Sequence, residues 1–298
     1  MSDFLRFRRR TLQTPVHHFV HPDTGRRIAV IGTMHMGEPG YFAGLRTVID
    51  GLEDDGAVVQ CEASSLLLLD EQTEQTLTGD ERVVLDMRKR RMELELRRVT
   101  ELGWVRQLDV LGYPDRWQKV DLGIVEVIRR VGTETMLRNE VRAIEMFDRP
   151  DNDPRSIERL RLLLRFMFIG FRVTVWSSAR RAARPGTPAA IDAVLIDQRD
   201  ALALEALWGT EQDTVLIWGC AHLPGIEAGI TRRGFVRDGA TQWHTAAVLP
   251  TVRSILSRLA ALPRTVGTAG PVDQAVPDTA APADLENDAT PVETSPLP

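Results

Sequence analysis

The 298-residue sequence predicts an α/β protein with one central mixed sheet. Three observations support this fold class. Two apolar runs rich in β-branched residues, 27–31 and 214–218, are each followed by the pattern Gly-x-x-His. A segment in which apolar residues recur at helical spacing separates the first run from a third apolar run, as in the crossover between parallel strands. Long helical patterns fill the middle of the chain, so both ends of the sequence supply strands to the sheet.

The N-terminal strands are expected to form a hairpin. Residues 16–20 and 26–31 flank a Pro-Asp-Thr-Gly sequence, residues 22–25, whose composition is typical of a tight turn. Apolar side chains then recur at helical spacing from Tyr41 to Leu52, which predicts a helix with one buried face.

The next strand is predicted over residues 57–61 and ends at Glu62. A strand, a helix and a second strand of these lengths favour a parallel pair. We therefore expect the strand before Glu62 to lie beside the strand over 26–31, with both ending at the same edge of the sheet.

Four helical patterns follow, over residues 80–103, 121–147, 155–183 and 189–208. We expect a helical insertion over about residues 80–185 that caps the sheet. The second Gly-x-x-His strand comes next, and it is followed by a short helix, two strands and an amphipathic helix, predicted over residues 223–233, 234–237, 242–248 and 251–262.

Composition predicts one α/β domain over residues 1–262 and a disordered tail over 263–298. The tail is rich in Pro, Ala and Thr, and after Arg264 it holds six acidic residues and no basic residue. The net charge of the chain is −5, so the folded part is nearly neutral and no charge excess favours nucleic acid as a partner. The basic run 88–91 alternates with acidic residues at helical spacing, which is typical of a solvated helix.

No apolar core follows the charged N-terminal residues, so a signal peptide is not predicted and we expect a cytoplasmic protein. The most membrane-like segment, residues 160–176, contains three arginines, which are costly at the centre of a bilayer. We expect a buried or interfacial helix there. Membrane contact without a span and a homodimer both stay open as interactions of this helix.

The two repeated histidines are the first candidates for chemistry. His35 and His222 follow strands in the same local pattern, although the whole chain contains only six histidines. Glu62 ends the third predicted strand at the same edge, where ligands of open α/β sheets bind. Two imidazoles and a carboxylate match a divalent metal site with open positions, and Glu62 would act either as a metal ligand or as a general base.

Arg199 is the fourth candidate. It lies in the helical pattern that precedes the second Gly-x-x-His strand. Its guanidinium would hold either Glu62 or a substrate carboxylate through two hydrogen bonds. The alternative is a solvated helical charge paired with Asp197 or Asp200.

At these positions the sequence resembles the TraB/PrgY/GumN and Tiki group, which belongs with the erythromycin-esterase and ChaN-like superfamily. The resemblance covers about residues 27–250 and rests on the ordered set Gly-x-x-His, Glu, Arg, Gly-x-x-His, which begins at Gly32 and ends at His222. It implies an α/β fold with paired repeats and, from the Tiki branch, a divalent-metal-dependent peptidase. It also implies that His35, Glu62, Arg199 and His222 are the functional residues.

The sequence differs from the group beside two of these residues. Ala63 and Ser64 follow the Glu, where Leu-Asp or Gly is common, and Gln198 and Asp200 flank the Arg, where Glu and Asn are common.

Three functions follow from these features. The first is a metal-dependent hydrolase of amide or peptide bonds, in which His35, His222 and Glu62 hold Mn²⁺, Co²⁺ or Zn²⁺. The second is a metal-free hydrolase of the erythromycin-esterase type, in which His and Glu activate water. The third is a module that binds a peptide or haem without turnover. The expected partner is a peptide or another small-molecule substrate.

Overall fold

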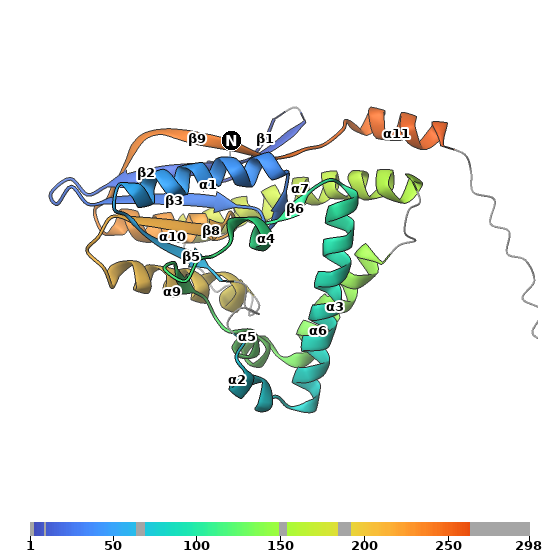
Figure 1. Cartoon of the computed structure of the whole chain (residues 1–298), viewed down its shortest axis with the longest axis horizontal. Helices are drawn as coiled ribbons and strands as arrows, with labels where there is room; N and C mark the ends of the chain where they lie inside the picture. The colour runs from blue at the N-terminus through green and yellow to red at the C-terminus, as the bar shows by residue number, and fades with distance from the viewer. Residues whose placement is uncertain (1–2, 9, 64–68, 149–153, 184–191, 263–298) are drawn as a thin grey trace, which may run out of the picture. The chain divides into compact units, whose positions relative to one another are not determined.

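The computed structural model of the chain describes residues 3–8, 10–63, 69–148, 154–183 and 192–262 (Figure 1). The described residues up to Leu262 belong to one compact unit. The predicted tail, residues 263–298, lies outside the described residues.

Within the described part of the chain, a mixed sheet of seven strands forms the centre of the fold (Figure 1). Its order is β1 (Arg6–Arg8), β2 (Thr11–Val20), β3 (Arg27–Thr33), β8 (Thr214–Gly219), β5 (Val58–Glu62) and β7 (Gln118–Val120), and β9 (Val236–Val248) also pairs with β2. The pairs β3–β8, β8–β5 and β5–β7 are parallel, whereas β2 is antiparallel to its three partners. The predicted α/β class, with strands from both ends of the chain, is confirmed.

The hairpin is confirmed, but the predicted neighbour of β3 is wrong. β2 and β3 pair from Val16–Ile31 to Val20–Arg27. β5 does not lie beside β3, because β8 is inserted between them and pairs with both. The connection through α1 (Pro39–Asp54) therefore skips one strand position, and the two Gly-x-x-His segments follow adjacent strands.

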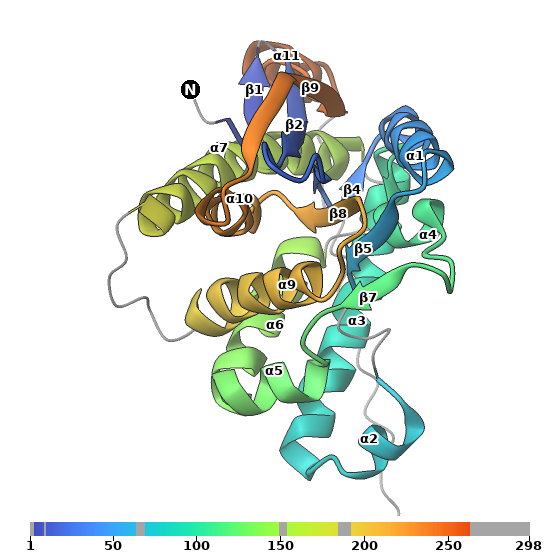
Figure 2. The ribbon, with the colours of Figure 1, turned by 90° about the vertical axis from the view of Figure 1, so that its left-hand side faces the viewer.

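Helices cover the two faces of the sheet (Figure 2). α1 packs its apolar face on one side, where Phe42 and Leu45 join a core with Ile31 and Ile217. α9 (Gln198–Trp208) and α10 (Leu223–Arg232) cover the opposite side, where the core includes Trp218. Successive strand residues point to opposite faces, so the buried strands β3 and β8 supply both cores.

The central insertion contains more than helices. Its helices are α2 (Glu71–Gln75), α3 (Gly79–Glu101), α4 (Gln107–Leu111), α5 (Ile124–Val131), α6 (Thr133–Phe147) and α7 (Pro154–Ala183). The helix predicted over 121–147 is two helices, because Gly132 takes a φ of 93° between them. The insertion also supplies β7 to the main sheet and β6 (Val105–Arg106) to a small sheet with β4 (Met36–Gly37).

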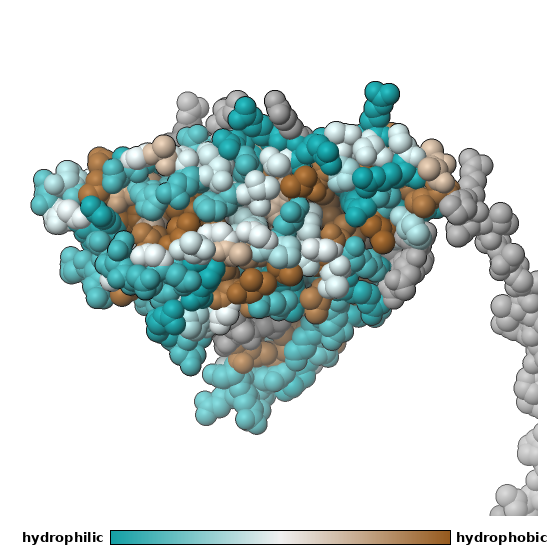
Figure 3. Space-filling view, turned by 45° about the horizontal axis from the view of Figure 1, so that its top comes forward, coloured by the Kyte–Doolittle hydropathy of each residue, from teal (hydrophilic) through white to brown (hydrophobic). Residues whose placement is uncertain are grey.

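The C-terminal described elements extend the sheet and pack against α7. The two strands predicted over 234–237 and 242–248 form the single strand β9, which pairs along most of β2 with two register shifts. α11 (Val252–Ala261) follows β9 and contacts α7. In the described residues we find no helix with both the length and the apolar character that a membrane crossing requires. Hydrophilic residues cover much of the face in Figure 3, and apolar residues are visible between them.

Candidate functional site

Three of the four predicted site residues are in direct contact at the carboxyl ends of the parallel strands. Glu62 ends β5, and His222 follows the turn after β8, where the His222 N–H donates to the Gly219 carbonyl at 2.9 Å. Arg199 lies in the first turn of α9, directly after a π-helical turn over Ala193–Asp197. Single π-helical turns inside helices are frequent at functional sites.

Arg199 is the centre of the cluster. It donates to Asp121 from Nε at 2.6 Å and from Nη2 at 2.8 Å, and Nη2 also donates to Glu62 Oε1. Nη1 donates to the Leu195 carbonyl at 3.3 Å and to His222 Nε2 at 3.2 Å. An arginine has five N–H donors, so every donor of Arg199 has a partner within the protein. Arg199 therefore holds Glu62, as one of the two predictions stated, and has no donor left for a substrate carboxylate.

Asp200 orients the His222 ring. The two side chains are buried, and His222 Nδ1 lies 2.7 Å from Asp200 Oδ1. A neutral ring that donates from Nδ1 to Asp200 and accepts from Arg199 at Nε2 satisfies both contacts. Burial raises the pKa of Asp200 to about 6, although the hydrogen bond to His222 opposes this rise. Gly225 makes room for the carboxylate, because a Cβ at that position would lie 1.9 Å from Asp200 Oδ2.

Glu62 is held in its ionised form. Its Oε2 accepts the Gly219 N–H at 2.7 Å, and its Oε1 accepts from Arg199. Burial favours the neutral carboxyl, but electrostatic attraction to His222, Arg199 and His35 and the hydrogen bond from the Gly219 N–H outweigh burial and lower the pKa of Glu62 to about 2. A carboxylate with this pKa is a weak base, so the geometry does not favour Glu62 as the general base.

His35 is the exposed member of the site. It follows β3, and its side chain is close enough to Glu62 for their charges to interact. Its backbone carbonyl accepts the Gln107 N–H at 2.9 Å, which ties the segment to α4. Among the residues that the structure describes, the imidazole of His35 has no hydrogen-bond partner.

Asp121 completes the cluster and was not predicted from the sequence. It directly follows β7, so it occupies the same edge of the sheet as Glu62. Its carboxylate is buried and forms a two-point ion pair with Arg199. Burial raises the pKa of Asp121, and the hydrogen bonds from Arg199 oppose the rise. The sequence carries little signal for Asp121, because the strand before it has only three residues; in the structure Asp121 follows Val120, which pairs with Glu62.

The described arrangement does not fit a divalent metal held by His35, His222 and Glu62. The guanidinium of Arg199 contacts both Glu62 Oε1 and His222 Nε2, which lie 3.8 Å apart, so a positive group already occupies the place where a cation would share these ligands. Within the described residues, no group of three or more His, Cys, Asp or Glu side chains is arranged to hold a metal ion.

Comparisons with known proteins add no assignment to this geometry. No family model, curated protein or solved structure matches the chain. The functional interpretation therefore depends on the contacts of the cluster, and the resemblance to the TraB and Tiki group stays a prediction.

Proposed function

We propose that the chain is a metal-free hydrolase of ester or amide bonds, with its reaction centre at His35 and Glu62. The observation that supports this function is that every N–H donor of Arg199 is hydrogen-bonded within the protein. Because all five of its donors are engaged, Arg199 fixes Glu62 as an ionised carboxylate beside the exposed imidazole of His35.

His35 takes the proton of the attacking water in this mechanism. Imidazole is the side chain best suited to proton transfer near neutral pH, and the ring of His35 is open to solvent. The water oxygen then bonds to the carbonyl carbon, the ester or amide bond breaks, and the imidazolium, which is attracted by the negative charge of Glu62, gives its proton to the leaving alcohol or amine. The Asp200–His222 pair and Arg199 act as positioning groups, because they hold Glu62 and each other and leave no free donor toward a substrate.

The test is hydrolysis of a panel of activated esters and anilides by the purified chain, with and without EDTA. We expect turnover that EDTA does not change. His35→Ala should lower kcat by about 10²-fold or more, as for loss of a general base. Glu62→Gln should lower it as well, whereas His21→Ala, in the turn between β2 and β3, is the matched control and should not.

The charge balance of the cluster favours metal-dependent hydrolysis as a second candidate. The carboxylates of Glu62 and Asp121 contact the Arg199 guanidinium and that of Asp200 contacts His222, so the buried cluster holds three acidic groups and one permanent positive charge, a difference that a divalent cation would compensate. This candidate requires Arg199 to leave its described position. It predicts that EDTA abolishes turnover and that Mn²⁺, Co²⁺ or Zn²⁺ restores it. Turnover of no substrate would contradict both hydrolase functions and favour the module that binds a peptide or haem.

A further inference from the structure

Three segments that are distant in the sequence, in β1, α7 and α11, meet at one end of the molecule (Figure 2). The guanidinium of Arg165 in α7 donates to the carbonyl of Pro250, just before α11, at 3.2 Å, and its central carbon lies 5.0 Å from the centre of the Phe7 ring in β1. At the other end of α11, Arg155 donates to the Leu262 carbonyl. These contacts join the segments into one surface, which we call the basic surface. Its described residues are 6–8, 10–11, 154–168 and 248–262.

The basic surface carries a large excess of positive charge. Three of its described arginines lie in residues 6–8 and 10–11, four in 154–168 and two in 248–262. Glu158 is its one described acidic residue, and it is buried and paired with Arg161 at 2.5 Å and with Arg258 at 3.2 Å. One carboxylate cannot balance this number of guanidinium groups, so the surface is strongly positive.

Three of these arginines are exposed and have no ion-pair partner among the described residues. They are Arg8 in β1, Arg159 in α7 and Arg253 in α11. Solvent ions screen exposed charges that lie farther apart than about 10 Å at an ionic strength of about 0.1 M. The local excess of arginine, rather than the net charge of −5, therefore decides which partners this surface attracts.

Apolar side chains are exposed beside these arginines. Phe166 in α7 is 57% exposed, and Leu256 in α11 is 52% exposed. Arg155, Arg159 and Phe166 recur at helical spacing along one face of α7, and this face borders α11 because Arg155 contacts its end. Leu256 follows Arg253 by three residues, so these two side chains share a face of α11. Apolar and cationic side chains together on exposed helices are typical of proteins that lie in the interface of a bilayer.

We propose that the basic surface binds a lipid bilayer with anionic headgroups, with the arginines at the lipid phosphates and Phe166 and Leu256 in the interfacial layer. Charge complementarity supplies the attraction, and burial of the apolar side chains adds to it. Nucleic acid would also attract the arginines, but contact with its phosphates would leave Phe166 and Leu256 in water. The exposed apolar residues therefore favour a bilayer. This inference does not depend on the proposed hydrolase activity.

The experiment is co-sedimentation of the full chain with lipid vesicles. One set of vesicles contains phosphatidylcholine alone, and the other also contains phosphatidylglycerol, which is anionic. We expect binding to the anionic vesicles and little binding to phosphatidylcholine alone. Raising the salt from about 0.1 M to about 1 M shortens the screening length from about 10 Å to about 3 Å, so it should weaken the binding.

Three variants test the residues that the proposal assigns to the bilayer. Arg159→Gln and Arg253→Gln should each weaken binding to the anionic vesicles about fivefold, as for loss of one arginine near an anionic surface. Leu256→Gln should weaken it about threefold or more, because the side chain no longer enters the interface. All three side chains are exposed, so the variants should fold.

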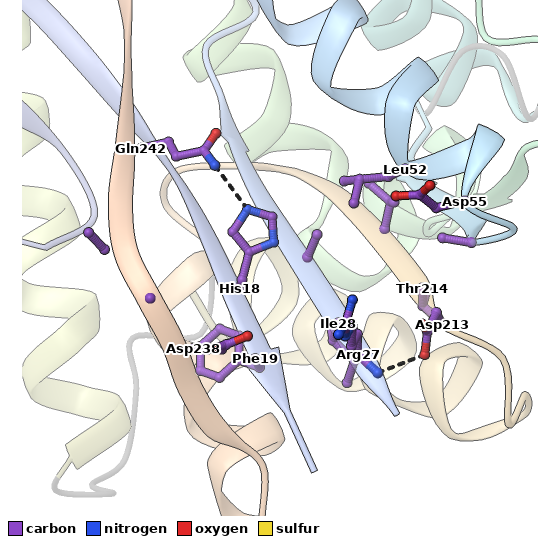
Figure 4. Close-up of a pocket in the computed structure, with 15 residues that line it drawn as sticks. His18, Phe19, Arg27, Ile28, Leu52, Asp55, Asp213, Thr214, Asp238 and Gln242 are labelled. Atoms are coloured by element: carbon purple, nitrogen blue, oxygen red, sulfur yellow. Dashed lines mark hydrogen bonds between the residues drawn. The ribbon is translucent and has the colours of Figure 1, made fainter. Parts of the chain in front are cut away.

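Two matched controls lie at the other end of β2. Arg27 is exposed and lines a pocket together with three aspartates (Figure 4), and Val236 is 51% exposed. Both residues pair with Val20, which is nine residues along β2 from Thr11 and therefore roughly 30 Å from the basic surface. Arg27→Gln and Val236→Gln should leave vesicle binding unchanged.

The fraction of protein that sediments at each lipid concentration gives the affinity. The proposal is wrong if phosphatidylglycerol does not increase binding, if Leu256→Gln binds as tightly as the parent, or if Arg27→Gln weakens binding as much as Arg159→Gln does. A fluorescence anisotropy titration with single-stranded RNA covers the alternative partner. Binding of RNA without binding of anionic vesicles would assign the arginines to nucleic acid and would also refute the proposal.

Discussion

Replacing Arg199 tests the network on which the site depends. Arg199→Met keeps an unbranched side chain but removes the charge and all five N–H donors. The buried carboxylates of Glu62 and Asp121 would then face each other without a shared cation. Breaking a buried ion pair by removing one partner costs about 3–5 kcal/mol. A domain is typically stable by about 5–15 kcal/mol, so we expect a large but measurable loss of unfolding free energy.

The pH dependence of this loss has a defined sign. In the parent protein the pKa of Glu62 is about 2, below its ordinary value of 4.5, so the stability that this carboxylate contributes is present above pH 4.5 and is lost as the pH falls toward 2. Burial already raises the pKa of Asp121 in the parent, and removing Arg199 removes the hydrogen bonds and the charge that oppose this rise; Glu62 likewise loses one of the charges that lower its pKa. A buried acid with a raised pKa loses stability as the pH rises, so the deficit of Arg199→Met should widen from about pH 4 to about pH 7.

Urea unfolding followed by circular dichroism at these two pH values measures the effect. The matched control is Arg116→Met. Arg116 makes a similar two-point contact with Glu53, at 2.8 and 3.0 Å, but its side chain is 59% exposed. We expect the control to lose much less stability than Arg199→Met, because solvent screens an exposed ion pair. Equal losses for the two variants, or a deficit of Arg199→Met that shrinks as the pH rises, would refute the reasoning.

Two further predictions concern the Asp200–His222 pair. Gly225→Ala places a Cβ 1.9 Å from Asp200 Oδ2, so overpacking should cost about 1–3 kcal/mol in urea unfolding, whereas Gly51→Ala in α1, with no atom within 4 Å of the added Cβ, should not destabilise the fold. In the parent, the pKa of Asp200 is raised from 3.8 to about 6, so its contribution to stability is full below pH 3.8 and falls as the pH rises through 6. Asp200→Asn should lack that fall, and the same slope in both proteins between about pH 4 and pH 6 would count against a raised pKa.

The sequence identified most residues of the site, but it did not show how their side chains contact one another. The Gly-x-x-His pattern and the strand before Glu62 are local signals, because a residue after a strand lies at the edge of the sheet. Arg199 was a candidate through its helix, but only the fold shows that one side chain contacts Glu62, Asp121 and His222 together.

The features that the sequence did not reveal depend on contacts between distant segments. β7 is only three residues long, Gln-Lys-Val, and has no apolar alternation that predicts a strand, so Asp121 after it was not a candidate. The insertion of β8 between β3 and β5 joins residues more than 150 positions apart, which no local pattern encodes. The five N–H donors of Arg199 are likewise all engaged only because four separate segments meet in the fold. These segments contain Glu62, Asp121, Leu195 and His222.

The central position of β8 has a consequence for synthesis on the ribosome. β3 and β5 emerge early, but Thr214 follows Glu62 by about 150 residues, which takes roughly 10–30 s at ordinary rates of translation. During that interval the edges of β3 and β5 that later bind β8 are both unpaired. Such edges are templates for aggregation, so we expect the nascent chain to depend on chaperones until its last third has been made.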